Sequence, residues 1–169
     1  MPPHDGKVLF VMPNRNMRFD WKKLNRQQVG AFSEYFVKME LTMYGFQVYG
    51  SEVDDRGIDL VARHEKGPYF SVQVKSLREK GYVFMQKEKF EIPPDWYLVL
   101  AILNQGKEPE LYMIPSEAWK SPNSLLVDRD YEGRKSKPEW GINLSIKNML
   151  LLEEYAFVKM VAKLQAMQA

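Results

Sequence analysis

The sequence predicts an α/β fold with a mixed central sheet, and three patterns indicate it. A helical period over residues 26–44 precedes three short runs that are typical of strands, at 46–50, 58–64 and 69–76. The segment WYLVLAIL, residues 96–103, is an unbroken apolar run of the kind that forms a buried central strand. The EKGP turn makes neighbouring strands antiparallel, and the PPD break at 93–95 allows a crossover.

The helix at 26–44 has clear boundaries and two apolar stripes. Asn25 is a suitable N-cap, and Gly45 suits the position just after the helix end. The first stripe contains Val29, Phe32, Phe36, Met39 and Met43. The second contains Gly30, Val37 and Leu41, and steps of three and four residues put Glu34 in its middle.

The remaining segments predict a mixture of short elements. Residues 82–92 are expected to begin as a strand and become a short helix, and 111–114 to form another strand. Ser116 is expected to cap a short helix. Residues 121–144, rich in Pro, Gly, Ser and charge, predict a long loop. Residues 146–167 predict a C-terminal helix with Leu150, Phe157, Val161 and Leu164 on one side.

Length and composition limit the class of protein. The 169 residues fit an N-terminal arm, 1–24, in which 7–12 could form a short strand, and one domain, 25–169, with its core at 25–120. Apolar residues make up 45% and aromatic residues 13%, which predicts a folded chain. Cysteine is absent, so thiolate zinc sites are excluded and a cytoplasmic location is expected. No signal peptide or membrane-spanning run is expected, and therefore no membrane partner.

Polar residues interrupt three apolar patterns that are expected to come together. Glu34 interrupts a helix stripe, and Asp59 interrupts the strand at 58–64. Gln73 and Lys75 share the polar face of FSVQVKS, which the EKGP turn pairs with the strand of Asp59. Burying a carboxylate or an ammonium group is costly unless it is paired or bound to a metal. These side chains would satisfy one another around a hard divalent cation such as Mg²⁺.

The predicted catalytic residues are Glu34, Asp59, Gln73 and Lys75, with Mg²⁺ or Mn²⁺ as cofactor. Asp59 is the natural inner-sphere ligand, and the Gln73 side-chain oxygen and the Val74 carbonyl could complete the site. Glu34 could bind the cation directly or through water. Lys75 could orient or help deprotonate an attacking water, or stabilise the transition state.

This pattern resembles the PD-(D/E)XK nuclease superfamily. The resemblance rests on Glu34, on Asp59 in GID, on Gln73-Val74-Lys75, and on the order αβββαβ over roughly residues 25–115. The R-x-x-D-L strand before Q-V-K is similar to small bacterial members, and the superfamily includes restriction enzymes, Holliday junction resolvases and homing endonucleases. The resemblance implies a restriction-endonuclease-like core and metal-dependent hydrolysis of DNA. Two departures are Gln73 in place of an acidic residue, which weakens cation binding, and the absence of proline before Asp59.

Basic side chains that could contact a DNA backbone occur in three clusters. They are Arg15, Arg18, Lys22, Lys23 and Arg26; Arg78, Lys80, Lys87 and Lys89; and Arg134, Lys135 and Lys137. Arg78 and Lys80 directly follow the proposed catalytic strand and are, with Arg56, the predicted DNA contacts. Trp21 and Trp140 could stack on bases or pack in the core. The C-terminal helix could belong to the core or form a homodimer interface.

Each of these residues also has a simpler interpretation. Glu34 could be an exposed helix residue paired with Lys38, and Asp59 could start an edge strand. Gln73 and Lys75 could line a solvated sheet face. With the same fold, the chain could be an inactive nucleic-acid-binding or assembly subunit whose Gln73 marks a decayed site. It could also be an α/β interaction protein that binds no nucleic acid.

Overall fold

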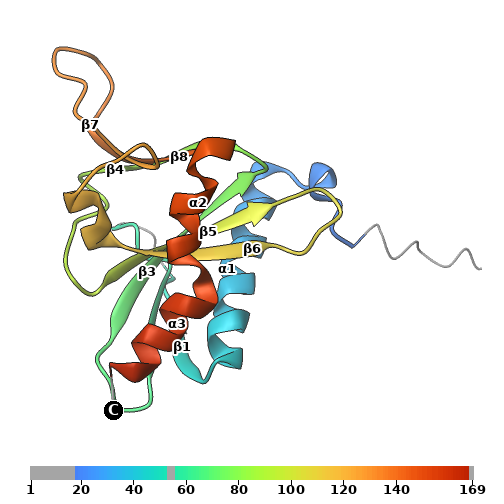
Figure 1. Cartoon of the computed structure of the whole chain (residues 1–169). Coiled ribbons are helices and arrows are strands. Elements are labelled where there is room, and N and C mark those ends of the chain that lie inside the picture. The colour runs from blue at the N-terminus through green and yellow to red at the C-terminus, as the bar shows by residue number, and fades with distance from the viewer. Residues whose placement is uncertain (1–17, 53–55, 168–169) are drawn as a thin grey trace, which may run out of the picture.

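The central element of the computed structural model, which describes residues 18–52 and 56–167, is a five-stranded mixed sheet (Figure 1). Its order is β1-β2-β3-β5-β6, and only the β3–β5 pair is parallel. The strands are β1 (Phe46–Gly50), β2 (Leu60–His64), β3 (Phe70–Arg78), β5 (Trp96–Leu103) and β6 (Glu110–Pro115). The predicted mixed α/β sheet is therefore confirmed. The predicted strand at 7–12 and most of the predicted arm lie outside the described residues.

The helix α1 (Arg26–Met43) begins and ends where the sequence predicts. Asn25 and Gln28 form a capping box, because each side-chain oxygen accepts the backbone N–H of the other residue at 2.9 Å. Gly45 follows the helix with a φ of +85°, a conformation that other residues adopt at a cost. A short 3₁₀ helix, η2 (Trp21–Lys23), precedes α1.

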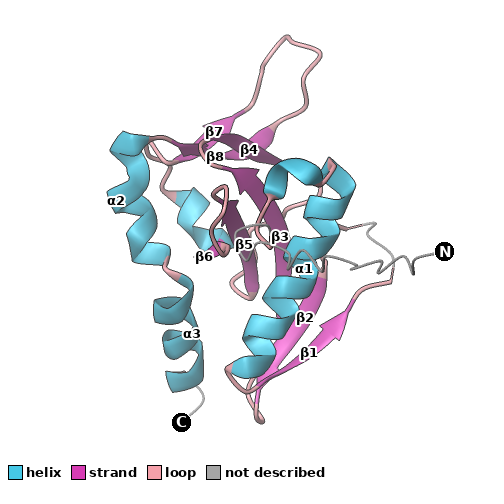
Figure 2. Ribbon diagram, turned by 90° about the vertical axis from the view of Figure 1, so that its right-hand side faces the viewer, coloured by secondary structure: helices cyan, strands magenta, loops and turns pink. Residues whose placement is uncertain are grey.

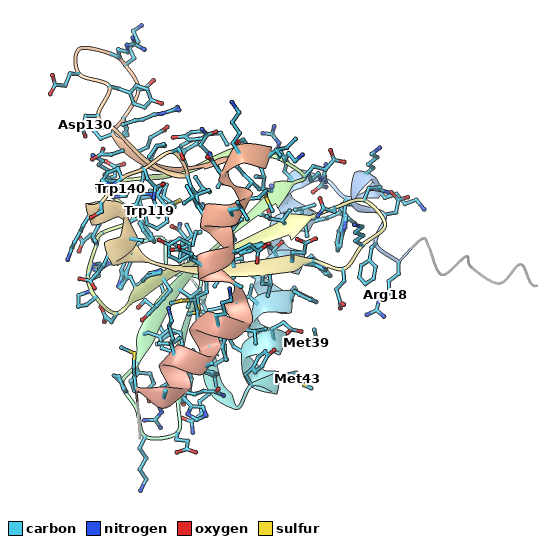
Figure 3. The ribbon with its side chains drawn as sticks, in the orientation of Figure 1. Arg18, Met39, Met43, Trp119, Asp130 and Trp140 are labelled. Atoms are coloured by element: carbon cyan, nitrogen blue, oxygen red, sulfur yellow. The ribbon has the colours of Figure 1, made fainter. Side chains whose placement is uncertain are left out.

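Only part of the first predicted apolar stripe of α1 is buried. Val29 of this stripe is buried, as are Val37 and Leu41 of the second stripe, whereas Met39 is 50% and Met43 78% exposed. Figure 3 shows Met39 and Met43 on α1. The helix presents the face of Val29, Ser33, Val37 and Leu41 to the sheet, at steps of four residues. Met39 and Met43 lie on the opposite side of the helix and are exposed, so the first apolar stripe does not continue into the core at the end of α1.

A second, three-stranded sheet corrects two predictions. It consists of β4 (Gly81–Gln86), β7 (Leu126–Arg129) and β8 (Glu139–Leu144), in the antiparallel order β4-β8-β7. Residues 87–90 form a turn where a short helix was expected, so the crossover from β3 to β5 runs through a strand. Residues 121–144 are not one long loop, because alternating apolar residues such as Leu126, Ile142 and Leu144 join a buried cluster.

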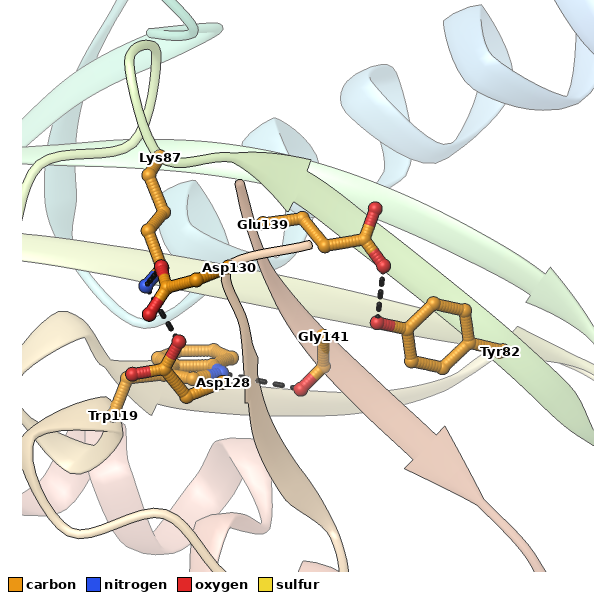
Figure 4. Close-up of polar contacts among 7 residues, drawn as sticks. All are labelled: Tyr82, Lys87, Trp119, Asp128, Asp130, Glu139 and Gly141. Atoms are coloured by element: carbon orange, nitrogen blue, oxygen red, sulfur yellow. Dashed lines mark hydrogen bonds and ion pairs between the residues drawn. The ribbon is translucent and has the colours of Figure 1, made fainter. Parts of the chain in front are cut away.

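The second sheet is fastened by polar contacts (Figure 4). The Lys87 ammonium group pairs with Asp128 at 2.5 Å and with Asp130 at 2.6 Å, which ties the end of β4 to the β7–β8 hairpin. The indole N–H of Trp119 donates to the Gly141 carbonyl at 3.1 Å. Figure 2 shows β4, β7 and β8 together at one end of the central sheet.

The C-terminal segment is broken into short helices. They are η4 (Ile146–Asn148), α2 (Met149–Leu152), η5 (Glu153–Tyr155) and α3 (Phe157–Ala166); a further short helix, η3 (Ser116–Lys120), lies between β6 and β7. Phe157, Val161 and Leu164 are buried as predicted. Leu150 is 83% exposed, contrary to the prediction, because α2 and α3 do not share one helical period. Ser116 does not cap η3: its hydroxyl donates to the Pro93 carbonyl at 2.6 Å.

The two faces of the central sheet have different covers. Residues of α1 and α3 share a buried cluster with Val72, Val74 and Val99 on one face. The alternate residues Leu98 and Leu100 pack against the second sheet, η3 and α2 on the other. Gln73 and Lys75 belong to this second face, because side chains alternate along β3. Among the described residues, no helix is long and apolar enough to cross a bilayer.

Candidate active site

The strands β2 and β3 separate at Asp59. Their pairing ends at Leu60 and Val72, and the Asp59 N–H makes one further bond, to the Val72 carbonyl at 3.0 Å. Beyond this point the Asp59 carboxylate takes the place of a strand carbonyl as acceptor, because its Oδ2 accepts the Val74 N–H at 2.6 Å. The carboxylate is therefore held at the opening between the two strands, and Asp59 does not start an edge strand, since β2 lies between β1 and β3.

The Val74 carbonyl faces the same opening. Within a strand, the N–H and C=O of one residue point to the same side. Because the Val74 N–H points to Asp59, the Val74 carbonyl does so as well, beyond the last paired residue of β2. Two of the predicted cation ligands, the Asp59 carboxylate and the Val74 carbonyl, thus lie at the same edge of β3.

Gln73 carries a buried oxygen that needs a partner. The residue is 7% exposed, and its Oε1 accepts no hydrogen bond from the described residues. An unsatisfied buried acceptor costs about 1–3 kcal/mol, which marks a place for a water or an ion. Gly57 has a φ of +72°, and a Cβ at this position would lie 3.1 Å from Gln73 Nε2. The absence of a side chain at Gly57 therefore lets the backbone pass close to the Gln73 amide. The burial of Gln73 excludes a solvated sheet face at this position.

The donor set fits a hard divalent cation. It offers a carboxylate, a buried amide oxygen and a backbone carbonyl, and oxygen ligands are those that Mg²⁺ and Mn²⁺ take. Within the described parts of the chain, no three His, Asp or Glu side chains group as a metal site. A cation at the opening would therefore depend on the neutral oxygens beside Asp59.

A positively charged hollow of about 580 Å³ adjoins the opening. It is lined by Arg26, Gln73, Lys75, Tyr82, Val83, Phe84, Met85, Gln86 and Lys89. No carboxylate is among these residues. The charged groups of Arg26, Lys75 and Lys89 have no ion-pair partner among the described residues, although Lys75 is half-buried. Their charges add to a field that favours an anion such as a phosphate group.

Glu34 belongs to α1, which packs against β1 and β3. Arg26, Glu34 and Lys38 are on one face of α1 because they follow at steps of four residues. Arg26 lines the hollow. Lys38 Nζ would lie 3.3 Å from a Cβ built on Gly50, which pairs with Leu60 beside Asp59. The half-buried Glu34 makes no ion pair with Lys38, whose ammonium group lies 5.7 Å from the Tyr35 ring centre.

Tyr82 forms a fixed wall of the hollow. Its hydroxyl donates to Glu139 Oε1 at 2.6 Å (Figure 4), and the Tyr131 hydroxyl donates to the same oxygen at 2.8 Å. Burial raises the pKa of Tyr82, and the hydrogen bond to the Glu139 carboxylate raises it further. Tyr82 therefore stays a neutral hydrogen-bond donor at physiological pH.

Comparison with solved structures identifies the fold. The Holliday junction resolvase Hjc of Archaeoglobus fulgidus aligns with 79% of this chain and 96% of its own, at 13% identity and a TM-score of 0.52. This chain has a resolvase-like fold. The bacterial homing endonuclease I-Ssp6803I aligns with 80% of this chain and 97% of its own, at 19% identity and a lower TM-score of 0.45. No protein-family model and no curated protein sequence matches the chain.

The resolvase-like fold separates the predicted DNA contacts. Arg56 is exposed next to Gly57, at the rim of the opening. Arg78 donates a hydrogen bond to the Leu24 carbonyl, and Lys80 lines a different hollow, together with Ile146 and Met149. The cations that join Lys75 are Arg26 and Lys89, which belong to two separate basic clusters of the sequence. The spacing of residues in the sequence does not indicate that Arg26 and Lys89 line the same hollow.

The two candidate tryptophans have structural partners. Trp21 is 3% exposed, and its indole N–H donates to the carbonyls of Asn104 and Lys107, both at 3.0 Å. Trp21 is therefore a core residue and cannot stack on a base. The Lys87 ammonium group lies 4.1 Å from the Trp140 ring centre, which gives that ring a cation partner.

Proposed function

We propose that the chain is a metal-dependent DNA endonuclease that hydrolyses phosphodiester bonds at the opening between β2 and β3. One observation carries the proposal: the Asp59 carboxylate accepts the N–H of Val74, the residue that follows Gln73, and the buried Gln73 oxygen accepts no hydrogen bond from the described residues. Lys75, which makes no ion pair with the described residues, lines the adjoining hollow. The resemblance to PD-(D/E)XK nucleases and the resolvase-like fold support this function.

The residues that would hold the cation are Asp59, Gln73 through Oε1, and Val74 through its carbonyl. Glu34 assists directly or through a water. When bound, Mg²⁺ or Mn²⁺ supplies positive charge that stabilises the phosphate in the transition state and lowers the pKa of a water. Because Gln73 is neutral, the site binds the cation less tightly than a site with two carboxylates on these strands.

The cations of the hollow act on the DNA. Arg26 and Lys89, which line the hollow with Lys75, bind the phosphate backbone. Lys75 orients the attacking water and stabilises the charge that develops on the phosphate oxygens. The water oxygen forms a new bond to phosphorus, the bond to one sugar oxygen breaks, and the departing oxygen takes up a proton.

The proposal is tested by incubating the purified chain with plasmid and linear DNA in Mg²⁺, in Mn²⁺ and in EDTA. We expect cleavage with either cation and none in EDTA. Asp59→Asn abolishes the cleavage, whereas the control Glu91→Gln, which changes an exposed carboxylate, retains it. Cleavage in EDTA, or equal cleavage by Asp59→Asn, would rule out this mechanism.

The neutral side chain of Gln73 favours a second candidate, an inactive nucleic-acid-binding or assembly subunit with the same fold. Such a subunit would bind nucleic acid at the positive hollow without hydrolysing phosphodiester bonds. Calorimetric titration with Mn²⁺ separates the two proposals. A subunit of this kind takes up no Mn²⁺ and still binds DNA with an affinity that falls steeply as salt rises.

A further inference from the structure

The outer face of the second sheet carries an exposed aromatic surface. Alternation along β4 puts Tyr82, Phe84 and Gln86 on the face opposite to the buried Met85. Phe84 is 48% exposed, and its ring is nearly parallel to that of Tyr82, with an angle of 20° and 6.3 Å between the centres. Any side chain at Gly141, the residue paired with Phe84, would collide with the Tyr82 ring. The absence of a side chain at Gly141 thus makes room for the aromatic pair.

The support beneath this surface is rigid. The Tyr82 hydroxyl is fixed by Glu139, and the guanidinium carbon of Arg129 lies 4.3 Å from the Tyr82 ring centre. Glu139 is itself buried and accepts a second hydrogen bond, from Tyr131. Tyr82 is therefore held on several sides, and its ring lies next to that of the exposed Phe84.

The aromatic surface continues into the positive hollow. Tyr82 and Phe84 line the same hollow as Arg26, Lys75 and Lys89. A chain that lays its phosphates on these cations therefore brings its bases within reach of Phe84. The bases of a duplex are already paired and stacked on their neighbours, so only an unpaired base offers its face to a protein ring.

We infer that the site takes DNA with unpaired nucleotides beside the scissile phosphate, and that one unpaired base stacks on Phe84. This inference rests on the proposed function and specifies its substrate: a single-stranded segment, such as a tail or a flap, instead of an uninterrupted duplex. The charge of the hollow suits the backbone of this segment, and the exposed ring suits its base.

The test compares binding of three fluorescein-labelled DNAs by anisotropy, in EDTA so that no cleavage occurs. The first is a single strand of about 16 nucleotides, which is the upper end of the site size of a small single-strand-binding domain. The second is a blunt duplex of the same sequence, and the third is that duplex with an unpaired tail. Phe84→Ala lowers the affinity for the single strand and the tailed duplex by about 5-fold to 100-fold, the effect of losing one stacked base. Affinity for the blunt duplex stays at the wild-type value.

Two matched variants control the result. Phe84→Trp keeps an aromatic ring and retains the affinity for unpaired DNA. Tyr35→Ala removes an aromatic side chain that is 70% exposed on α1, away from the hollow, and changes none of the three affinities. An unchanged affinity of Phe84→Ala for unpaired DNA, or an equal loss for the blunt duplex, overturns the inference.

The outcomes also distinguish this inference from the proposed function. If the wild type cleaves DNA with Mg²⁺ and Phe84→Ala binds all three DNAs normally, only the inference fails. If unpaired DNA binds through Phe84 but no cation ever supports cleavage, the inference holds and the proposed hydrolysis fails. If none of the three DNAs binds even at low salt, both fail.

Discussion

The Asp59 carboxylate accepts a 2.6 Å hydrogen bond from the Val74 N–H at the point where β2 leaves β3. One side chain thereby satisfies a backbone donor that the sheet leaves unpaired, and it is fixed at the strand opening. The same carboxylate is the central cation ligand of the proposed function. Stability and activity are therefore linked at this residue, and variants can separate the two.

Removing the acceptor at Asp59 lowers stability more than removing its charge. In Asp59→Ala the Val74 N–H loses its partner, and we expect the free energy of unfolding to fall by about 1–3 kcal/mol. Asp59→Asn keeps an oxygen at the same place and loses less. Urea denaturation of the two variants measures the difference. Equal losses would show that the hydrogen bond to Val74 contributes nothing to stability.

Gln73→Glu strengthens cation binding and weakens the cation-free protein. A second carboxylate beside Asp59 repels it and is buried at a cost, so the melting temperature without cations falls. With Mn²⁺ the added charge raises affinity, by roughly tenfold or about 1.4 kcal/mol. The thermal shift caused by Mn²⁺ is therefore larger in the variant than in wild type. If Mn²⁺ shifts the melting temperature of both proteins equally, the cation either binds away from Gln73 or does not bind at all.

If the hollow binds DNA as proposed, Arg26 and Lys89 contact its phosphates. We expect Arg26→Ala and Lys89→Ala each to weaken binding to every sequence equally and to reduce the salt-dependence slope by about one. Anisotropy titrations at several salt concentrations measure the slope. The control is Lys66→Ala, an exposed lysine in the β2–β3 turn, which leaves it unchanged. Slopes equal to wild type in both test variants would exclude the hollow as the DNA site.

Tyr82 makes stability fall at alkaline pH. Burial first, and then the bond to Glu139, raises its pKa above the ordinary value of 10.0, so at high pH the folded protein holds a proton that the unfolded chain has lost. This contribution is complete below about pH 10, the pKa of a free tyrosine, and is lost as the pH rises further. Tyr82→Phe therefore has a shallower alkaline loss of stability than wild type. Parallel denaturation curves against pH would contradict the assignment.

Local patterns were sufficient to predict the strands that carry the candidate site. The alternation in FSVQVKS and the EKGP turn fix which residues of β2 and β3 are neighbours, and this pairing brings Asp59 to the backbone of Val74, which lies between Gln73 and Lys75 in the sequence. The caps of α1 were equally predictable, since Asn25 and Gly45 act within one turn of the helix. In each case the physical cause lies within a few residues of its effect.

The second sheet depends on contacts that no local pattern contains. β4 pairs with β8, more than fifty residues later in the chain, and β7 and β8 flank a segment at 130–138 whose proline, glycine and charge indicate a loop. These short strands are stabilised mainly by burying one face in a shared core. The meeting of Arg26 with Lys89, and the aromatic surface at Phe84, follow from the same long-range pairing.

The most direct test of the account is single-turnover cleavage by Lys75→Ala, measured with saturating Mg²⁺ and with protein in excess over DNA. Lys75 lines the positive hollow together with Gln73, and it makes no ion pair with the described residues. We predict a fall in the cleavage rate of about 10²–10³-fold, the usual cost of losing one stabilising charge, with DNA binding only slightly weakened and the control Lys66→Ala unchanged. A Lys75→Ala protein that cleaves at the wild-type rate would contradict the account.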